Sequence, residues 1–123
     1  ICGWSGMMSL TRNPMSAIMA VPEARRMTID AMNEALSIAK AKNINIDKDF
    51  MNETIEYFSS VGDDAVSSML LDILNGNPIE IDVINAAAVV MADSVGVSTP
   101  VNSFITNVLR VYHSKIMSEI NKK

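Results

Sequence analysis

Hydrophobic residues recur every three to four positions along nearly the whole chain, and no stretch alternates apolar and polar residues as a half-buried β-strand does. That spacing matches the 3.6-residue turn of an α-helix. The pattern predicts a single all-α domain over residues 1–123, without linkers, low-complexity tracts or internal repeats. Its helices are expected at about residues 1–20, 22–43, 48–60, 64–75 and 78–95, with a sixth starting at residue 100.

Residues that cap or break helices set the expected boundaries. Pro14 lies inside the first pattern and removes a backbone donor, so it is expected to kink or interrupt that helix. Asn43 can take the left-handed conformation that ends a helix. The break at residues 62–64 supplies N-caps for the fourth helix, and Thr99 followed by Pro100 is a favourable start for the sixth.

Glu80 fits two different roles. With Asn77 as N-cap and Pro78 as the first helical residue, Glu80 would be the third residue of the fifth helix. A carboxylate at that position completes a capping box and interacts favourably with the helix dipole. Caps outnumber catalytic carboxylates, so local spacing favours the cap over a residue of a chemical site.

Composition and charge narrow the class of function. Hydrophobic residues make up 49% of the chain but aromatic residues only 5%, and ten residues are Met. This predicts packed helices with a core of aliphatic side chains and Met. The formal net charge of −4 argues against nucleic-acid binding. The apolar run Ala86 to Ala92 is too short to span a bilayer, so no membrane association and a cytoplasmic location are expected.

One cysteine, Cys2, and one histidine, His113, limit the available metal and redox chemistry. No disulfide can form within the chain, and a Cys/His zinc site would lack ligands, so no metal is predicted. His113 has no Asp, Ser or Cys partner nearby in the sequence and is expected at the surface or at a helix end. Gly3-x-x-Gly6 lacks both a preceding strand and a third glycine, so the chain by itself cannot hold a dinucleotide in the usual way.

A polar stripe runs along the otherwise apolar first helix, on the side that carries Ser5, Ser9, Arg12, Asn13 and Ser16. Such a stripe faces either solvent or a polar cleft in which hydroxyl, amide and guanidinium groups bind a small anionic ligand. The sequence leaves these two interpretations open. Ser68 and Asp72 lie one turn apart, off the apolar face of their helix, and there a solvated surface is favoured.

Several short segments, specific as a set, stand in one order up to about Val111: Asn13-Pro14-Met15-Ser16-Ala17, Glu34, Ser67-Ser68-Met69-Leu70 with Asp72-Ile73, Glu80-Ile81-Asp82 with Ile84-Asn85, and Gly96-Val97 with Thr99-Pro100-Val101-Asn102. In this order and spacing they resemble the C-terminal domain of the ketopantoate reductase (2-dehydropantoate 2-reductase) family. The resemblance implies a helical domain of the kind found in 6-phosphogluconate dehydrogenase-like reductases.

The same resemblance implies a two-domain enzyme in which an N-terminal Rossmann domain, outside these residues, binds NADPH. The helical domain closes the cleft over a small 2-keto acid and forms a homodimer. In this family the keto group of 2-dehydropantoate is reduced to give pantoate, on the pathway to pantothenate and coenzyme A. The hydride comes from the nicotinamide, and a lysine on the first helix supplies the proton and stabilises the developing alkoxide. The chain begins with Ile, which indicates a fragment, a processed chain or missing upstream residues.

By this resemblance, Asn13 contacts substrate, Ser68 binds the substrate carboxylate, and Glu80 contacts substrate or cofactor ribose at the interdomain cleft. Glu80 is then expected to be both a cap and a site residue. Two family positions differ: Ser5 stands where the lysine is expected, and Ser9 where a second asparagine is expected. Ser5 is a poor acid and carries no charge. This member therefore reduces a different 2-keto acid, relays the proton through water, or is a non-catalytic module for assembly or ligand sensing, and the isolated chain is not expected to be active.

Overall fold

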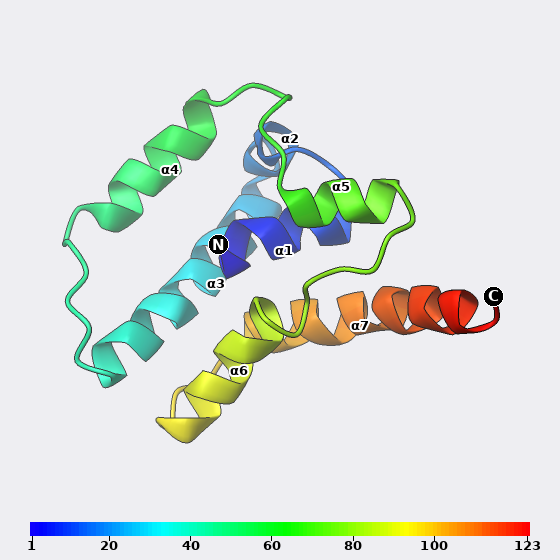
Figure 1. Ribbon diagram of the computed structural model, residues 1–123. Coiled ribbons are helices and arrows are strands. Elements are labelled where there is room, and N and C mark those ends of the chain that lie inside the picture. Colours follow the sequence, from blue (N-terminus) through cyan, green and yellow to red (C-terminus); the bar gives the residue numbers. More distant parts are fainter.

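The fold is entirely helical. The computed structural model describes residues 1–123 and contains no strand (Figure 1), which confirms the predicted all-α class. The seven helices are α1 (Cys2–Thr11), α2 (Met15–Met19), α3 (Pro22–Ala41), α4 (Phe50–Ser60), α5 (Ser68–Leu74), α6 (Asn85–Ser94) and α7 (Pro100–Asn121).

Helix α1 lies at the centre, and the other elements are arranged around it. It packs against α2, α3, α5, α6 and α7, whereas α4 lies at the outside against α2 (Figure 1). A helix surrounded in this way needs an apolar or small surface on all sides, which α1 has in the run from Gly3 to Ser9. The core around it consists of aliphatic side chains and Met, as the composition predicts, and its largest fully buried members are Met8, Met15, Met69, Leu70, Ile81 and Ile105.

Two glycines of α1 let its neighbours approach closely. A Cβ atom on Gly3 would lie 2.7 Å from Cγ and 3.2 Å from the backbone N of Met32 on α3. A Cβ atom on Gly6 would lie 2.7 Å from Cγ2 of Ile105 on α7 and 2.9 Å from Nδ2 of Asn85 on α6. Gly3 and Gly6, which do not form a phosphate-binding loop, therefore allow close packing of the helices.

A buried polar network joins four helices. Both carboxylate oxygens of Glu34 on α3 accept backbone hydrogen bonds at the start of α7, from Val101 N at 2.7 Å and Asn102 N at 2.9 Å. Asn102 Nδ2 also donates to Glu34 at 2.6 Å and to Ala31 O at 3.0 Å. Asn85 Nδ2 donates to Asn102 Oδ1 at 3.2 Å and to Cys2 O at 2.9 Å, which brings in α6 and α1. Glu34 thus caps α7, and the Thr99 side chain makes no capping bond.

The predicted break at Pro14 is confirmed. Helix α1 ends at Thr11, Arg12 follows with φ 56°, and α2 begins after Pro14. Asn43 has the expected positive φ of 57°, two residues beyond the end of α3. The fourth predicted helix, however, starts late.

Helix α5 begins at Ser68 and not at residue 64. Ser67 is its cap, because Ser67 Oγ accepts a hydrogen bond from Leu70 N at 3.2 Å. The caps predicted at residues 62–64 are therefore wrong.

The prediction of a helix from Pro78 is also wrong. Helix α6 begins only at Asn85, so Glu80 lies in a loop and is not a capping residue. Ile79 and Ile81 are 3% and 0% exposed, while Glu80 is exposed. Side chains of residues i and i+2 point to nearly opposite sides of a helix, but to the same side of an extended chain. Burying both isoleucines therefore requires the extended form and turns Glu80 outward.

We predict that Glu34→Gln destabilises the fold by about 2 kcal/mol. The neutral amide keeps the size of the side chain but loses the charge and one acceptor oxygen at the start of α7, leaving a donor unpaired. Chemical denaturation measures the difference. Glu56→Gln, in an exposed part of α4, is the matched control and should stay within about 0.5 kcal/mol of the parent. Equal stability of the two variants would contradict the assigned role of Glu34.

A second prediction concerns the close approach at Gly6. Alanine favours a helix by about 1 kcal/mol over glycine, but here its Cβ would press on Ile105 and Asn85, so Gly6→Ala is expected to destabilise by about 1–2 kcal/mol net. Thermal unfolding measures this. Gly62→Ala is the control, because nothing lies within 4 Å of its added Cβ, and it should be neutral or slightly stabilising. A stabilised Gly6→Ala variant would show that α7 is not tightly packed there.

Candidate functional site

The polar stripe of α1 is divided by the fold. Ser5 and Ser9, one turn apart, are 1% and 0% exposed, so they face neither solvent nor an open cleft. The Ser9 hydroxyl has no hydrogen-bond partner. Arg12 and Asn13 are exposed just beyond the end of α1, where Asn13 Nδ2 donates to Thr11 O at 2.7 Å. The sequence left open whether the stripe faces solvent or a polar cleft, and neither interpretation describes the whole stripe.

Ser68 is exposed in the first turn of α5. Its neighbour Ser67 caps the helix, and the hydroxyl of Ser68 makes no hydrogen bond within the protein. Asp72, one turn further, is half-buried and accepts a long hydrogen bond of 3.4 Å from Asn77 Nδ2. The predicted solvent-exposed position is therefore correct for Ser68.

Glu80 is exposed on a loop that α7 holds in place. Ile79 N donates to His113 Nδ1 at 3.2 Å, and Tyr112 Oη donates to Asn77 O at 3.0 Å. Tyr112 Oη also lies 3.3 Å from Ile73 O. Desolvation by burial raises the pKa of the Tyr112 phenol above its usual value.

His113 is a functional candidate that the sequence interpretation missed. It is half-buried against the loop and is not a surface or helix-end residue, since α7 continues to Asn121. A usable signal exists in the periodicity: Asn102, Thr106, Leu109 and His113 follow one another at intervals of three and four and share the inward face of α7.

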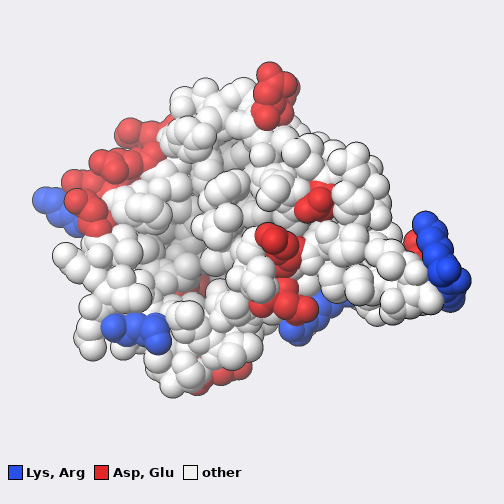
Figure 2. All heavy atoms as spheres, viewed as in Figure 1, with Lys and Arg blue, Asp and Glu red and all other residues white.

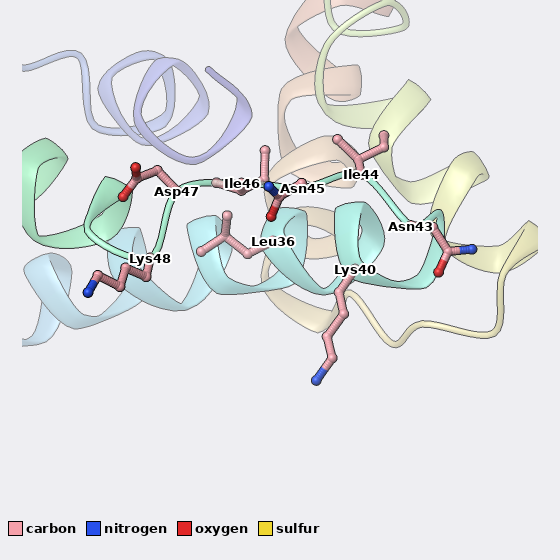
Figure 3. A pocket seen from close by; sticks show the side chains of 8 residues that line it. All are labelled: Leu36, Lys40, Asn43, Ile44, Asn45, Ile46, Asp47 and Lys48. Carbon is pink, nitrogen blue, oxygen red and sulfur yellow. The ribbon is translucent and has the colours of Figure 1, made fainter.

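None of the five principal hollows of the surface is lined by Ser5, Ser9, Asn13, Ser68 or Glu80. A hollow of about 530 Å³ lies between the second half of α3 and residues 43–48, and Figure 3 shows Lys40 and Lys48 pointing out of it. Charged side chains are scattered over the face in Figure 2, and several acidic ones lie near its centre. The site residues expected from the family are thus divided between the interior and the surface, and none of these five hollows joins them.

No group of three or more His, Cys, Asp or Glu side chains is placed to hold a metal ion. None of the helices combines the length and the apolar character needed to cross a membrane.

Residues 1–113 match the protein-family model of the ketopantoate reductase PanE/ApbA C-terminal domain. The chain belongs to this family. A 2-dehydropantoate 2-reductase from Pyrobaculum aerophilum is 27% identical over 106 residues, which are 86% of this chain and 38% of that protein.

Solved structures agree on the fold. A dimeric ketopantoate reductase from Staphylococcus aureus matches with a TM-score of 0.84 at 24% identity, covering 93% of this chain and 40% of that one. A D-mandelate dehydrogenase solved with NADH and anilino(oxo)acetate matches with a TM-score of 0.79 at 24% identity, covering 94% and 38%. The chain therefore spans about two fifths of the length of these ketopantoate reductase relatives.

The resemblance places the catalytic lysine of the family at the position of Ser5, and Ser5 is buried in this structure. A catalytic lysine must reach the substrate, whereas Ser5 is enclosed by its own domain. The roles of Ser5, Ser9, Asn13, Ser68 and Glu80 toward a ligand stay predictions.

We predict that Ser5→Lys destabilises the fold by at least about 2 kcal/mol, because an unpaired ammonium group would be placed in the packed interior. Ser114→Lys, on the exposed side of α7, is the control and should change stability by less than about 0.5 kcal/mol. Urea denaturation compares the two. If Ser5→Lys is tolerated as well as the control, Ser5 borders an accessible cleft and its burial is not a barrier to catalysis.

Proposed function

We propose that these residues form the substrate-binding and dimerisation domain of an NADPH-dependent oxidoreductase that reduces a small 2-keto acid, with 2-dehydropantoate as the first candidate. The match of residues 1–113 to the ketopantoate reductase family carries this proposal. The relative from Pyrobaculum aerophilum, a 2-dehydropantoate 2-reductase, supports the substrate. A cytoplasmic location goes with this assignment and stays a prediction.

The exposed candidates supply recognition. Ser68 offers a free hydroxyl beside the first turn of α5, where a substrate carboxylate is favoured by the helix dipole. Asn13 uses its Nδ2 within the turn after α1, and its Oδ1 is left for a donor on the ligand. Glu80 presents an acceptor-only carboxylate from the loop between α5 and α6. Each of these three groups can contact a ligand from the surface without help from Ser5 or Ser9.

NADPH supplies the hydride when it is bound. This chain has no glycine-rich phosphate loop, so most of the cofactor would be held by residues outside it. Glu80 is the residue of this chain that fits a ribose hydroxyl, because it is an exposed carboxylate on a loop fixed by contacts with α7. Its contribution is to orient the cofactor or the substrate.

The alkoxide that forms during reduction has no cation from α1 to stabilise it. A missing electrostatic donor of this kind costs about 3–4 kcal/mol of transition-state stabilisation. A bound water or a group outside this chain would then protonate the product. The D-mandelate dehydrogenase of the same fold was solved with anilino(oxo)acetate, so a 2-keto acid other than 2-dehydropantoate is the second candidate substrate.

An exposed apolar stripe on α7 is the proposed dimer surface. Phe104, Val108 and Val111 recur at helical spacing and are 53%, 40% and 72% exposed. With Arg12 and Lys115 they line a shallow hollow of about 590 Å³. Exposed apolar patches of this kind mark interaction sites. A second copy of the chain is the proposed partner, and the dimeric reductase from Staphylococcus aureus supports this choice.

A non-catalytic helical module for assembly or ligand sensing is the alternative function. The absence of the family lysine, whose expected position is occupied by Ser5, favours this alternative. It predicts binding of a 2-keto acid without turnover.

The test is NADPH oxidation by the full-length natural protein with 2-dehydropantoate and with a panel of other 2-keto acids. We expect turnover with at least one acid, and a decrease in kcat/KM of about 10- to 100-fold for Glu80→Gln, since a charge-assisted hydrogen bond is lost. Glu56→Gln, exposed on α4, is the control and should match the parent. Binding of NADPH and acid without turnover would favour the module, and no binding of any acid would contradict both.

A further inference from the structure

We propose that His113 is a positioning residue for Glu80: its Nδ1 holds the buried backbone N–H of Ile79 and thereby fixes the direction of the neighbouring carboxylate. The inference rests on the proposed role of Glu80 toward substrate or cofactor. It assigns a task to the single histidine of the chain, which lies outside the polar stripe of α1.

The loop needs an acceptor from outside its own backbone. Residues 78–80 take part in no backbone–backbone hydrogen bond; the nearest such bonds are those of Asn77 N to Asp72 O at 2.8 Å and Ala86 N to Ile81 O at 3.0 Å. Ile79 is 3% exposed, so water cannot easily serve its N–H. An unpaired buried N–H is costly, and His113 supplies the acceptor at 3.2 Å.

The hydrogen bond also defines the chemical form of the ring. A backbone N–H can only donate, so Nδ1 of His113 is an unprotonated acceptor and the ring proton lies on Nε2. No other side chain of α7 contacts the backbone of Ile79 in this way. The N–H of Ile79 therefore requires an acceptor atom at the δ position of residue 113. Asparagine at this position can also provide one, through its Oδ1.

The geometry connects this bond to Glu80. Ile79 and Ile81 both point inward, which leaves the residue between them pointing outward. Tyr112 fixes the loop before this point, through Asn77 O. The ion pair of Arg110 Nη2 with Asp82 Oδ1, 3.1 Å long, lies beyond it, but both of its side chains are more than half exposed, so it holds the loop weakly. The contact to Ile79 is the anchor next to Glu80.

The first test uses His113→Leu and His113→Asn in the 123-residue chain. For His113→Leu we expect amide exchange at Ile79 to accelerate roughly tenfold and the backbone order parameter at Glu80 to fall, while exchange at Met8 in the core of α1 is unchanged. His113→Asn should restore both values to within about twofold of the parent. In the parent, nitrogen chemical shifts should show the Nε2–H tautomer.

Three results would overturn the inference. They are an unchanged Ile79 amide in His113→Leu, equal acceleration at Met8, which would indicate loss of global stability only, and failure of His113→Asn to restore the loop.

The second test asks whether His113 acts through Glu80. In the full-length protein, His113→Leu should lower kcat/KM about as much as Glu80→Gln, and the double variant should lose little more than either single one. Fully multiplicative losses would show that His113 acts independently of Glu80. Absence of activity in the parent would contradict the proposed function, and the exchange measurements would still decide whether the anchor exists.

Discussion

The arrangement of this domain depends on the Glu34 carboxylate at the start of α7. Three N–H groups, two of them from the first turn of α7, point at this one side chain, and the helix dipole favours its negative charge. Asn102 and Asn85 extend the contact to α6 and to the first carbonyl of α1. The hydrogen bond from Asn85 to Cys2 O therefore fixes the first turn of α1. Because Gly3 and Gly6 let the neighbouring helices approach closely, α1 also lies deep in the core.

That depth determines what α1 can contribute to chemistry. A helix packed on every side buries the residues of its middle turns, and Ser5 and Ser9 are among them. A serine fits such a place, whereas an uncompensated lysine would not. The predicted ligand-binding residues that are exposed lie at the margins: Asn13 after α1, Ser68 at the start of α5, and Glu80 in the loop before α6. The domain has the fold of a ketopantoate reductase C-terminal domain, and Ser5 stands where the resemblance predicts the catalytic lysine.

Residues 78–80 make no backbone–backbone hydrogen bond, and side chains of α7 hold this part of the loop instead. Tyr112 donates a hydrogen bond to the loop, and His113 accepts one from it. A polar surface residue gains a defined direction when both of its neighbours are buried and one of them is hydrogen-bonded. Glu80 meets these conditions, which is consistent with its proposed role toward a ligand.

The sequence alone determined the features that depend on residues close to one another in the chain. The apolar period specified helices, Pro14 and Asn43 ended two of them, and abundant Met specified the kind of core. Tertiary structure decided what depends on distant partners: Glu34 caps a helix 67 residues later, and His113 anchors a loop 34 residues earlier. The capping pattern at residues 77–80 predicted a helix that does not form. The reason is that burying both Ile79 and Ile81 stabilises the fold more than a short extra turn of helix would. A sequence pattern records which residues favour burial, but the side they face is set by what packs against them.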